Sequence, residues 1–490
     1  MPFQTDDMTF DDSEEYRICS DCIDERYLKM EVDRIGELAN CSYCGAKGNT
    51  ITIEELADHV EKAFEDHYQR TSTEMTGLEW IAHKDPESTF EWERHGDPVC
   101  LLIQGEVGIE EKPAEHICHI LCERNYDFDM AAAGKENPFD EEAHYEEKDV
   151  SDHELQQGWV YFQKSLKTET RLFNREAESI LDFIFEGITD HTTYRLGSVI
   201  VKAGPGRKIS KLYRARVFQN DDNLEKALIR PDLEIGPPPF SAASAGRINA
   251  KGISVFYGAT NEKVALTEVR PPVGSRVAIG LFEIIRPIRL LDVEKLRSIY
   301  VKGSLFDPTF IRKLEKAKFL ETLSDHITMP VMPDDEAADY LVTQAIADYL
   351  SNRTSPELDG IIYRSIQNGN KGRNIALFHK SSRVEVLNIP EGSEFRAYLG
   401  MTTEDGRETD YTVIELEPEK PSKPRIKRKQ ISVFDPIEFS TPYHEDMDIR
   451  PTTLKIDADS MKVHHIQSVK VSSSSYSVSR YKSDRRKNKF

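Results

Sequence analysis

Two pairs of cysteines near the N-terminus constrain the fold of this 490-residue chain more than any other short pattern. Cys19 and Cys22 form one C-x-x-C pair, and Cys41 and Cys44, followed by Gly45, form the second. Four thiolates at this spacing can hold zinc in a tetrahedral site, and Gly45 permits the tight turn of a zinc knuckle. Because a structural zinc site uses all four ligands, we predict a site that stabilises the fold and not a catalytic metal. Four ordinary buried cysteines are the alternative.

The three other cysteines make an odd total of seven, unevenly placed along the chain. This pattern favours reduced thiols or metal ligands over a disulfide framework. In His116-Ile-Cys118-His119-Ile-Leu-Cys122 the spacing allows His119 and Cys122, or Cys118 and Cys122, to share one helix face. A second metal site is one interpretation, and packed core thiols are the other.

The length and charge of the chain limit the classes of protein to which it can belong. A chain of 490 residues predicts two to four domains. Its formal net charge of −22 argues against a chain-wide nucleic-acid surface. The basic end, residues 480–490, is the exception, and we interpret it as either a solvated tail or a local contact with nucleic acid or an acidic partner. Without an apolar run long enough to span a membrane, or a signal peptide, we expect a cytoplasmic protein.

The first half of the chain has mainly helical patterns. Thr52 and Glu55 form a capping box ahead of the apolar positions Leu56, Val60 and Phe64, which recur at helical spacing. A second helical pattern covers residues 172–188. The acidic run at 137–154 is typical of a solvated loop.

From about residue 195 short apolar strands alternate with Gly and Pro. The predicted strands are KLYRARVF, GISVFYG, RVAIGLFEII, DGIIYRS and NIALFH. One helix is predicted to start at Asp307-Pro308, and another covers about 334–351. Further along, residues 418–430 predict a basic linker, and the segment from Thr453 predicts one or two strands. The pattern is that of an α+β domain with a split or mixed sheet.

Three side chains between residues 211 and 270 are candidates for chemistry. Arg214 and Arg216 share one face of the strand KLYRARVF, where a guanidinium can clamp phosphate or carboxylate. Tyr257 ends the strand GISVFYG and offers a ring that can stack on a planar base. Glu268 falls on the apolar side of the short helix that Pro271-Pro272 must end, so it is either a functional acid or half of a buried ion pair with an arginine.

Several motifs in order, LYRAR, GRIN with GISVFYGA, ALTEVR, DGIIYRS and NIALF, together resemble the RES domain, a toxin family named for an arginine, a glutamate and a serine. The resemblance covers roughly residues 195–385. The region before it resembles the HEPN/RES N-terminal region. The resulting domain prediction is an acidic start and zinc knuckle (1–48), a helical HEPN/RES N-terminal region (49–192), a RES catalytic domain (193–390) and a C-terminal extension with a basic tail (391–490).

The resemblance implies an ADP-ribosyltransferase-like fold and an enzyme that degrades NAD by phosphorolysis or hydrolysis of the nicotinamide–ribose bond. The family's arginine, tyrosine, glutamate and serine match Arg214, Tyr257, Glu268 and Ser365. On this reading Glu268 stabilises an oxocarbenium-like transition state. Arg214 holds the pyrophosphate, Tyr257 stacks on nicotinamide, and Ser365 orients the ribose or phosphate. Secondary polar candidates for binding NAD are Arg247, Asn249 and Asn374.

Two other functions remain open at this point. The same fold can transfer ADP-ribose to a protein or nucleic acid, or the chain can be a zinc-dependent RNA-binding or adaptor protein without activity. The resemblance also implies inorganic phosphate as a candidate acceptor and an antitoxin as a partner. The size and placement of the N-terminal region lead to the hypothesis that it is a sensor or inhibitory module, which a trigger protein controls. The sequence leaves the acceptor, the trigger and the oligomeric state open.

Overall fold

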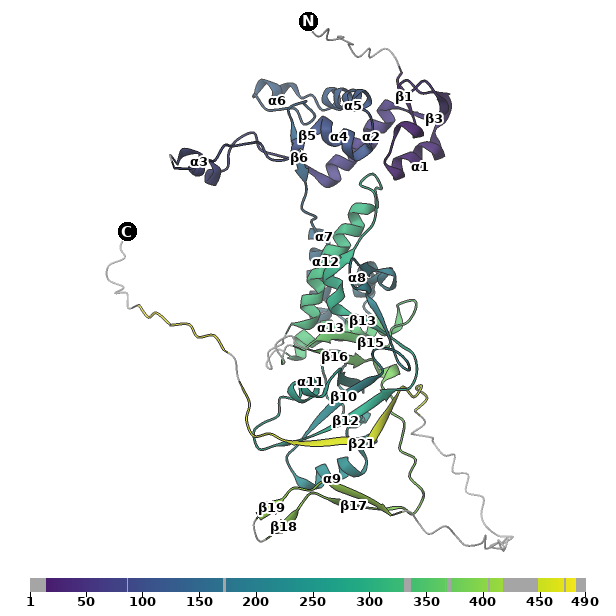
Figure 1. The fold of residues 1–490 in the computed structure, drawn as a ribbon, viewed down its shortest axis with the longest axis vertical. Coiled ribbons are helices and arrows are strands. Elements are labelled where there is room, and N and C mark those ends of the chain that lie inside the picture. Colours follow the sequence, from purple (N-terminus) through teal and green to yellow (C-terminus); the bar gives the residue numbers. More distant parts are fainter. Residues whose placement is uncertain are drawn as a thin grey trace, which may run out of the picture. The chain divides into compact units, whose positions relative to one another are not determined.

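A computed structural model of the chain describes residues 15–85, 87–170, 173–329, 336–365, 367, 372–403, 406–416, 448–470 and 473–481. The predicted acidic start, the basic linker at 418–430 and most of the basic end lie outside these residues. The chain divides into two compact units, which are described separately (Figure 1). Unit 1 contains the residues up to Lys164 with His191–Gly197 and Leu296–Asp325, and unit 2 contains Ser165–Asp190, Ser198–Lys295 and the residues from His326 onwards. No described helix has both the length and the apolar character needed to cross a membrane.

Unit 1 is mainly helical, with small sheets between the helices (Figure 1). Its sheets have the strand orders β1-β3-β2 and β4-β6-β5. The strands are β1 (Arg17–Cys19), β2 (Glu37–Asn40), β3 (Lys47–Thr52), β4 (Tyr68–Arg70), β5 (Asp97–Pro98) and β6 (His144–Glu147). The helices that lie in or begin in this unit are α1 (Arg26–Ile35), α2 (Ile53–His67), α3 (Gly77–Lys84), α4 (Val99–Val107), α5 (Glu111–Arg124), α6 (Phe128–Ala132), α7 (His153–Thr168) and α12 (Phe310–Thr328). A third small sheet joins β7 (Thr192–Thr193), β8 (Gly197–Ser198) and β14 (Ile299–Tyr300).

Helix α2 confirms the predicted capping box. The backbone N–H of Glu55 donates to Thr52 Oγ1 at 3.1 Å, and the Thr52 N–H donates to Glu55 Oε2 at 2.8 Å. These two bonds satisfy backbone donors that a helix start leaves without partners. The predicted apolar positions Leu56, Val60 and Phe64 are all buried in the core of the unit.

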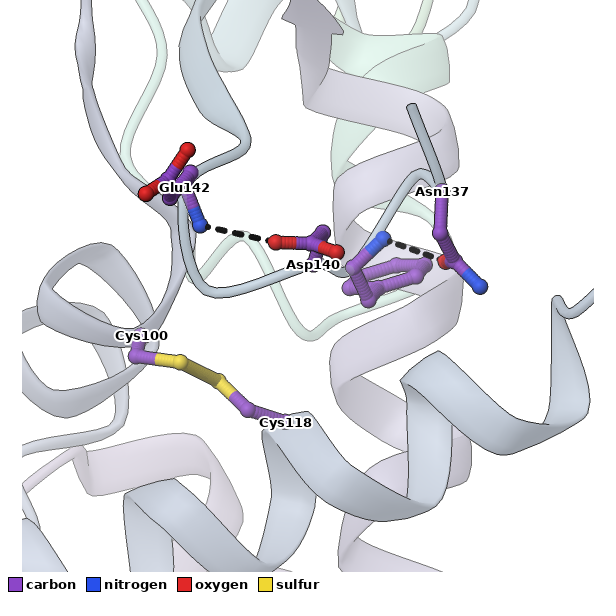
Figure 2. The surroundings of a disulfide bond; sticks show 6 residues. Cys100, Cys118, Asn137, Asp140 and Glu142 are labelled. Carbon is purple, nitrogen blue, oxygen red and sulfur yellow. Dashed lines mark hydrogen bonds between the residues drawn. A yellow bond between two sulfur atoms is a disulfide. The ribbon is translucent and has the colours of Figure 1, made fainter. Parts of the chain in front are cut away.

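The cysteines outside the C-x-x-C pairs correct the prediction of reduced thiols. Cys100 on α4 and Cys118 on α5 form a disulfide, which Figure 2 shows beside the loop that carries Asn137 and Asp140. Since Cys118 is bonded to Cys100, it cannot serve as a metal ligand, and Cys122 remains a free thiol. The interpretation of residues 116–122 as a second metal site that uses Cys118 is therefore wrong, and the candidate metal cluster found among the described residues is the one formed by the two C-x-x-C pairs. Sequence spacing along one helix could not reveal a partner on another.

Two predicted boundaries in unit 1 also change. Strand β6 lies within the acidic run predicted as a loop, because buried Tyr145 packs edge-on against Phe64 with ring centroids 5.2 Å apart. Helix α12 begins at Phe310 and not at Pro308. Asp307 Oδ1 instead accepts from the backbone N–H of Thr309 at 2.9 Å, so it closes a turn before the helix.

Unit 2 is built on a mixed eight-stranded sheet with the order β21-β12-β10-β11-β16-β15-β13-β9. Neighbouring strands are antiparallel except for the parallel pair β13 and β15. The strands are β9 (Ile200–Ala203), β10 (Lys211–Phe218), β11 (Phe256–Ala259), β12 (Arg276–Ile284), β13 (Ile288–Asp292), β15 (Gly360–Arg364), β16 (Arg373–Leu377) and β21 (Leu454–His465). All five strands predicted between residues 195 and 390 are present, and a strand is also present in the segment from Thr453.

Helices and two hairpins complete unit 2 (Figure 1). The helices are α8 (Arg175–Phe185), α9 (Asp221–Ile229), α10 (Pro231–Glu234), α11 (Glu262–Glu268) and α13 (Glu336–Asn352), and the hairpins pair β17 (Glu394–Tyr398) with β20 (Thr412–Leu416) and β18 (Met401–Thr403) with β19 (Gly406–Glu408). The predicted boundary at residue 390 falls inside this unit, since β21 pairs with β12 along most of its length.

Candidate active site

The sheet of unit 2 opens between β10 and β11. Strand β10 pairs with β12 from Lys211 to Phe218. With β11 it pairs at one register position, Tyr213 opposite Ala259. Beyond that position Arg214 Nη1 donates to the backbone carbonyl of Tyr257 at 3.2 Å, so a side chain takes the place of a ladder hydrogen bond. The two halves of the sheet therefore separate at the point where the candidate residues lie.

A cavity of about 400 Å³ lies at this opening. Its size is within the range of small-molecule sites. Arg214, Tyr257, Glu268, Arg247 and Asn374, all predicted from the sequence, line it. The other lining residues are Tyr213, Ala215, Gly246, Gly258, Ala259, Ala265, Val269, Arg270, Thr328, Tyr340, Tyr363, Arg364 and Gln367.

Among the described residues that line this cavity, Glu268 is the single carboxylate. It is the last residue of α11, a helix that begins at the N-cap Asn261, whose Oδ1 accepts from the Val264 N–H at 2.9 Å. Val264 and Ala265 are buried and pack with residues of β10, which turns the half-buried Glu268 toward the cavity. Amphipathic spacing on a short helix thus places an acid at a cavity wall.

Ser365 supports Glu268 from outside the cavity. Its Oγ donates to Glu268 Oε1 at 2.6 Å, a short bond typical of a hydroxyl and a carboxylate. Ser365 is completely buried and is not one of the lining residues. The structure therefore places it behind the acid, where it can fix the carboxylate, and not in the position to touch a ligand that the family resemblance implies.

Arg214 brings an uncompensated positive charge to the cavity. Among the ion pairs of the described residues none includes Arg214, so the alternative of a buried pair with Glu268 is not what the structure shows. Burial lowers the pKa of Arg214 to about 10, which leaves the guanidinium charged at neutral pH. Arg216, on the same strand, is instead paired with Glu234 at 2.9 Å and does not line the cavity.

Tyr257 is fixed by the loop that contains GRIN. Its hydroxyl donates to Asn249 Oδ1 at 2.9 Å and accepts from the Ile248 N–H at 3.1 Å. Burial raises the pKa of Tyr257 to about 12, so the ring remains neutral. A Cβ on Gly246 would lie 2.8 Å from this hydroxyl, which explains a glycine there. Asn249 is buried and does not line the cavity, so it positions Tyr257.

Two of the cavity arginines are already used within the protein. Arg247 donates to the backbone carbonyls of Ile327 at 2.5 Å and Met329 at 2.7 Å. Arg364 forms an ion pair with Glu294. Arg247 has no carboxylate partner within the described part of the chain, but two carbonyls already hold its guanidinium. Arg214 and Arg270 are therefore the lining arginines that neither a carboxylate nor two carbonyls of the described residues hold.

Sequence reasoning missed several lining residues. One of them is Tyr363, which is next to Arg364 in β15 and whose pKa is raised by burial. The alternation of GIIYR could have indicated that its ring points to the same face of the strand as Ile361. No sequence pattern predicts that Arg270 and Gln367 line the cavity, because their positions depend on a backbone turn and on a segment distant in the sequence.

The four cysteines of the two C-x-x-C pairs form a candidate metal centre in unit 1. Their ligand atoms all lie within 4.8 Å of one another, with Sγ–Sγ distances of 3.6 Å for Cys19–Cys22 and Cys19–Cys44 and 3.8 Å for Cys22–Cys41. Tetrahedral zinc with Zn–S bonds of about 2.3 Å needs sulfur atoms about 3.8 Å apart. Gly45 has a φ of 73°, as the predicted turn requires. The four thiols therefore fit a metal ion.

Comparison with protein families found a match to one domain. Residues 212–399 match the model of the RES domain. The chain carries a RES domain. Comparisons with curated proteins and with solved structures found no match. A RES domain suggests an enzyme that acts on NAD and is consistent with an NAD-related toxin or defence role.

Proposed function

We propose that the RES domain cleaves the bond between nicotinamide and ribose in NAD, with Glu268 as the carboxylate that stabilises positive charge at the reacting centre. One observation carries this proposal: among the described lining residues there is one carboxylate, held by a buried hydroxyl at 2.6 Å, and it shares the cavity with an arginine that no carboxylate of the described residues pairs. That pairing suits a substrate with a developing positive charge at one end and an anionic group nearby.

The chemistry needs few groups. The pyridinium ring of NAD leaves as neutral nicotinamide, so no general acid is required. As the bond breaks, positive charge develops on the ribose, and a carboxylate beside the anomeric carbon stabilises it. Glu268 supplies that carboxylate, Ser365 holds it in place, Arg214 binds pyrophosphate, and Tyr257 offers its ring to nicotinamide. Water or inorganic phosphate then attacks the ribose, giving ADP-ribose or its 1-phosphate.

The flanking parts have supporting roles in this proposal. Zinc, held by Cys19, Cys22, Cys41 and Cys44, would stabilise the fold of unit 1 and take no part in the reaction. We assign unit 1 a regulatory role in a cytoplasmic toxin or defence effector, in which an antitoxin or trigger protein controls consumption of NAD.

Release of nicotinamide from NAD by the purified full-length chain tests the proposal. We expect Glu268→Gln to reduce the rate by at least about 100-fold, because removal of one stabilising group commonly costs 10²–10³. Glu283→Gln is the control, since Glu283 lies on β12 of the same sheet, pairs with Lys211 at 2.9 Å and does not line the cavity. Equal rates for wild type and Glu268→Gln contradict the proposal.

The products separate the alternatives. Free ADP-ribose indicates hydrolysis, and ADP-ribose 1-phosphate in phosphate buffer indicates phosphorolysis. Label from NAD that stays on a macromolecule of a cell extract indicates transfer of ADP-ribose instead. No turnover, together with binding of RNA, supports the adaptor alternative.

A further inference from the structure

Arg270 has an unusual backbone conformation at the wall of the cavity. Its φ is 43°, in the left-handed region that favours glycine, and it follows directly after Val269, the C-cap of α11. Glycine is common at this position because a Cβ is unfavourable there. Strained residues other than glycine are concentrated at functional sites, where the surrounding structure maintains them. The strain at Arg270 therefore calls for a functional reason.

The side chain of Arg270 is held by a neutral neighbour, so its charge remains available to a ligand. Its Nη2 and Nε lie 2.7 and 3.1 Å from the side-chain oxygen of Gln367, once that amide is oriented to present its oxygen. Gln367 is neutral, so this contact orients the guanidinium without cancelling its charge. Both residues line the cavity and are exposed, as expected for a group that meets a ligand at the rim.

The cavity has more arginine side chains available to a ligand than one phosphoryl group needs. Arg364 is paired with Glu294, and two backbone carbonyls already hold the guanidinium of Arg247. Arg214 and Arg270 are the lining arginines that neither a carboxylate nor two carbonyls of the described residues hold, and one carboxylate among the described lining residues, Glu268, opposes them. The arginines reach the cavity from different elements, β10 and the turn after α11. Guanidinium groups bind phosphoryl oxygens in a bidentate manner, so two such groups match two phosphoryl groups.

We propose that Arg270 is a second phosphate-binding residue, which with Arg214 makes the cavity selective for ligands that contain a diphosphate. The inference rests on the proposed function and deepens it, because it names diphosphate-bridged nucleotides, and not mononucleotides, as the substrate class. Gln367 holds the Arg270 guanidinium in place before the ligand binds. The left-handed turn at Arg270 directs a long cationic side chain to a point where glycine would place none.

Calorimetric titration of the full-length chain with ADP and with AMP tests this inference. ADP has the two phosphoryl groups and AMP has one. We expect wild type to bind ADP about 10- to 100-fold more tightly than AMP, as one charge-assisted contact provides. Arg270→Gly should lose this preference, with weaker binding of ADP and a change of less than about threefold for AMP. Arg216→Gln, which removes a positive charge from β10 outside the cavity, should keep the preference.

Further readouts separate binding from folding. Glycine fits a φ of 43°, so the denaturation midpoint of Arg270→Gly should equal or exceed that of wild type. Arg270→Lys should restore part of the preference for ADP. For turnover of NAD, Arg270→Gly should raise KM at least about tenfold and change kcat by less than about threefold.

An unchanged ratio of ADP to AMP affinity in Arg270→Gly overturns the inference. So does a wild-type protein without any preference for ADP, or an equal loss of both nucleotides with a lowered denaturation midpoint. These results are distinct from failure of the proposed function, because nucleotide affinity is measured without turnover. A chain that binds ADP through Arg270 but releases no nicotinamide would leave the inference intact and contradict the reaction.

Discussion

Replacement of Ser365 by alanine removes one hydroxyl from behind Glu268. The Ser365 Oγ donates to Glu268 Oε1 at 2.6 Å, and the backbone N–H of Ser365 keeps its own bond to the Gly372 carbonyl at 3.2 Å. The substitution therefore releases the carboxylate and leaves the strand in place. A hydrogen bond to a charged group contributes about 1.5–3 kcal/mol. If that energy is used to hold the carboxylate in its reactive position, kcat should fall by about 10- to 100-fold.

The stability of the fold should change little. Glu268 is half-buried at a cavity, so water can replace the lost donor, and we expect a loss below about 1 kcal/mol in the free energy of unfolding. KM for NAD should remain within about threefold, because Ser365 does not line the cavity. The assay is the rate of nicotinamide release against NAD concentration, together with denaturant unfolding of the same samples.

Ser381→Ala is a matched control for this prediction. Ser381 is also completely buried, and its Oγ donates to Asp359 Oδ1 at the same distance of 2.6 Å, but neither residue lines the cavity. The Ser381→Ala substitution should lower the free energy of unfolding by about 1–3 kcal/mol and leave kcat unchanged. A Ser365→Ala enzyme with wild-type kcat, or one whose loss of rate follows its loss of stability as in Ser381→Ala, would refute the positioning role of Ser365.

Two further predictions concern the metal centre and the pH dependence of unit 2. Chelation of the metal from the four-cysteine cluster should lower the stability of unit 1 by about 3 kcal/mol or more, which calorimetry would show as a fall of about 6–12 °C in the melting temperature. The control variant Cys122→Ser, whose thiol lies outside the cluster, should melt at the wild-type temperature. A chelator without effect on the melting temperature would contradict a structural metal. The hydrogen bond from Lys462 lowers the pKa of Glu262 below its ordinary value of 4.5, so this carboxylate stabilises the folded state above that value and the stabilisation is lost as the pH falls through the folded-state pKa. Between pH 5 and 3 the denaturation midpoint of wild type should therefore fall more steeply than that of Glu262→Gln, and parallel curves would contradict the linkage.

The sequence predicted local features well and through-space features poorly. Alternation and capping identified β10 and α2, and proline identified the end of α11, since each depends on neighbours within a few residues. The position of Glu268 at a cavity also followed from helical spacing. The opening of the sheet did not, because it depends on which residue of β11 lies opposite Tyr213. The same reason explains the missed bond between Cys100 and Cys118, whose helices meet only in the folded chain.

Residue roles were less predictable than residue identities. The family resemblance names Ser365, but only the fold shows that it lies behind Glu268 and not in the cavity. Asn249 similarly supports Tyr257 and does not line the cavity. Arg270 had no sequence signal, because its backbone conformation is a property of the turn that follows α11. Whether a polar residue touches a ligand or supports a neighbour is decided by burial, which one sequence does not contain.

The C-terminal extension is part of unit 2. Both edge strands of the eight-stranded sheet, β9 and β21, come from residues outside the 212–399 match, and an edge strand left open invites pairing with other chains. Strand β21 also contacts α11, since Lys462 Nζ and His464 Nε2 lie 2.7 and 2.9 Å from the Glu262 carboxylate in the first turn of that helix. A helix of seven residues cannot hold its shape alone, so contacts at its start help to fix Glu268 at its end. The extension thus covers the edge of β12 and helps to hold Glu268, the carboxylate on which the proposed reaction depends.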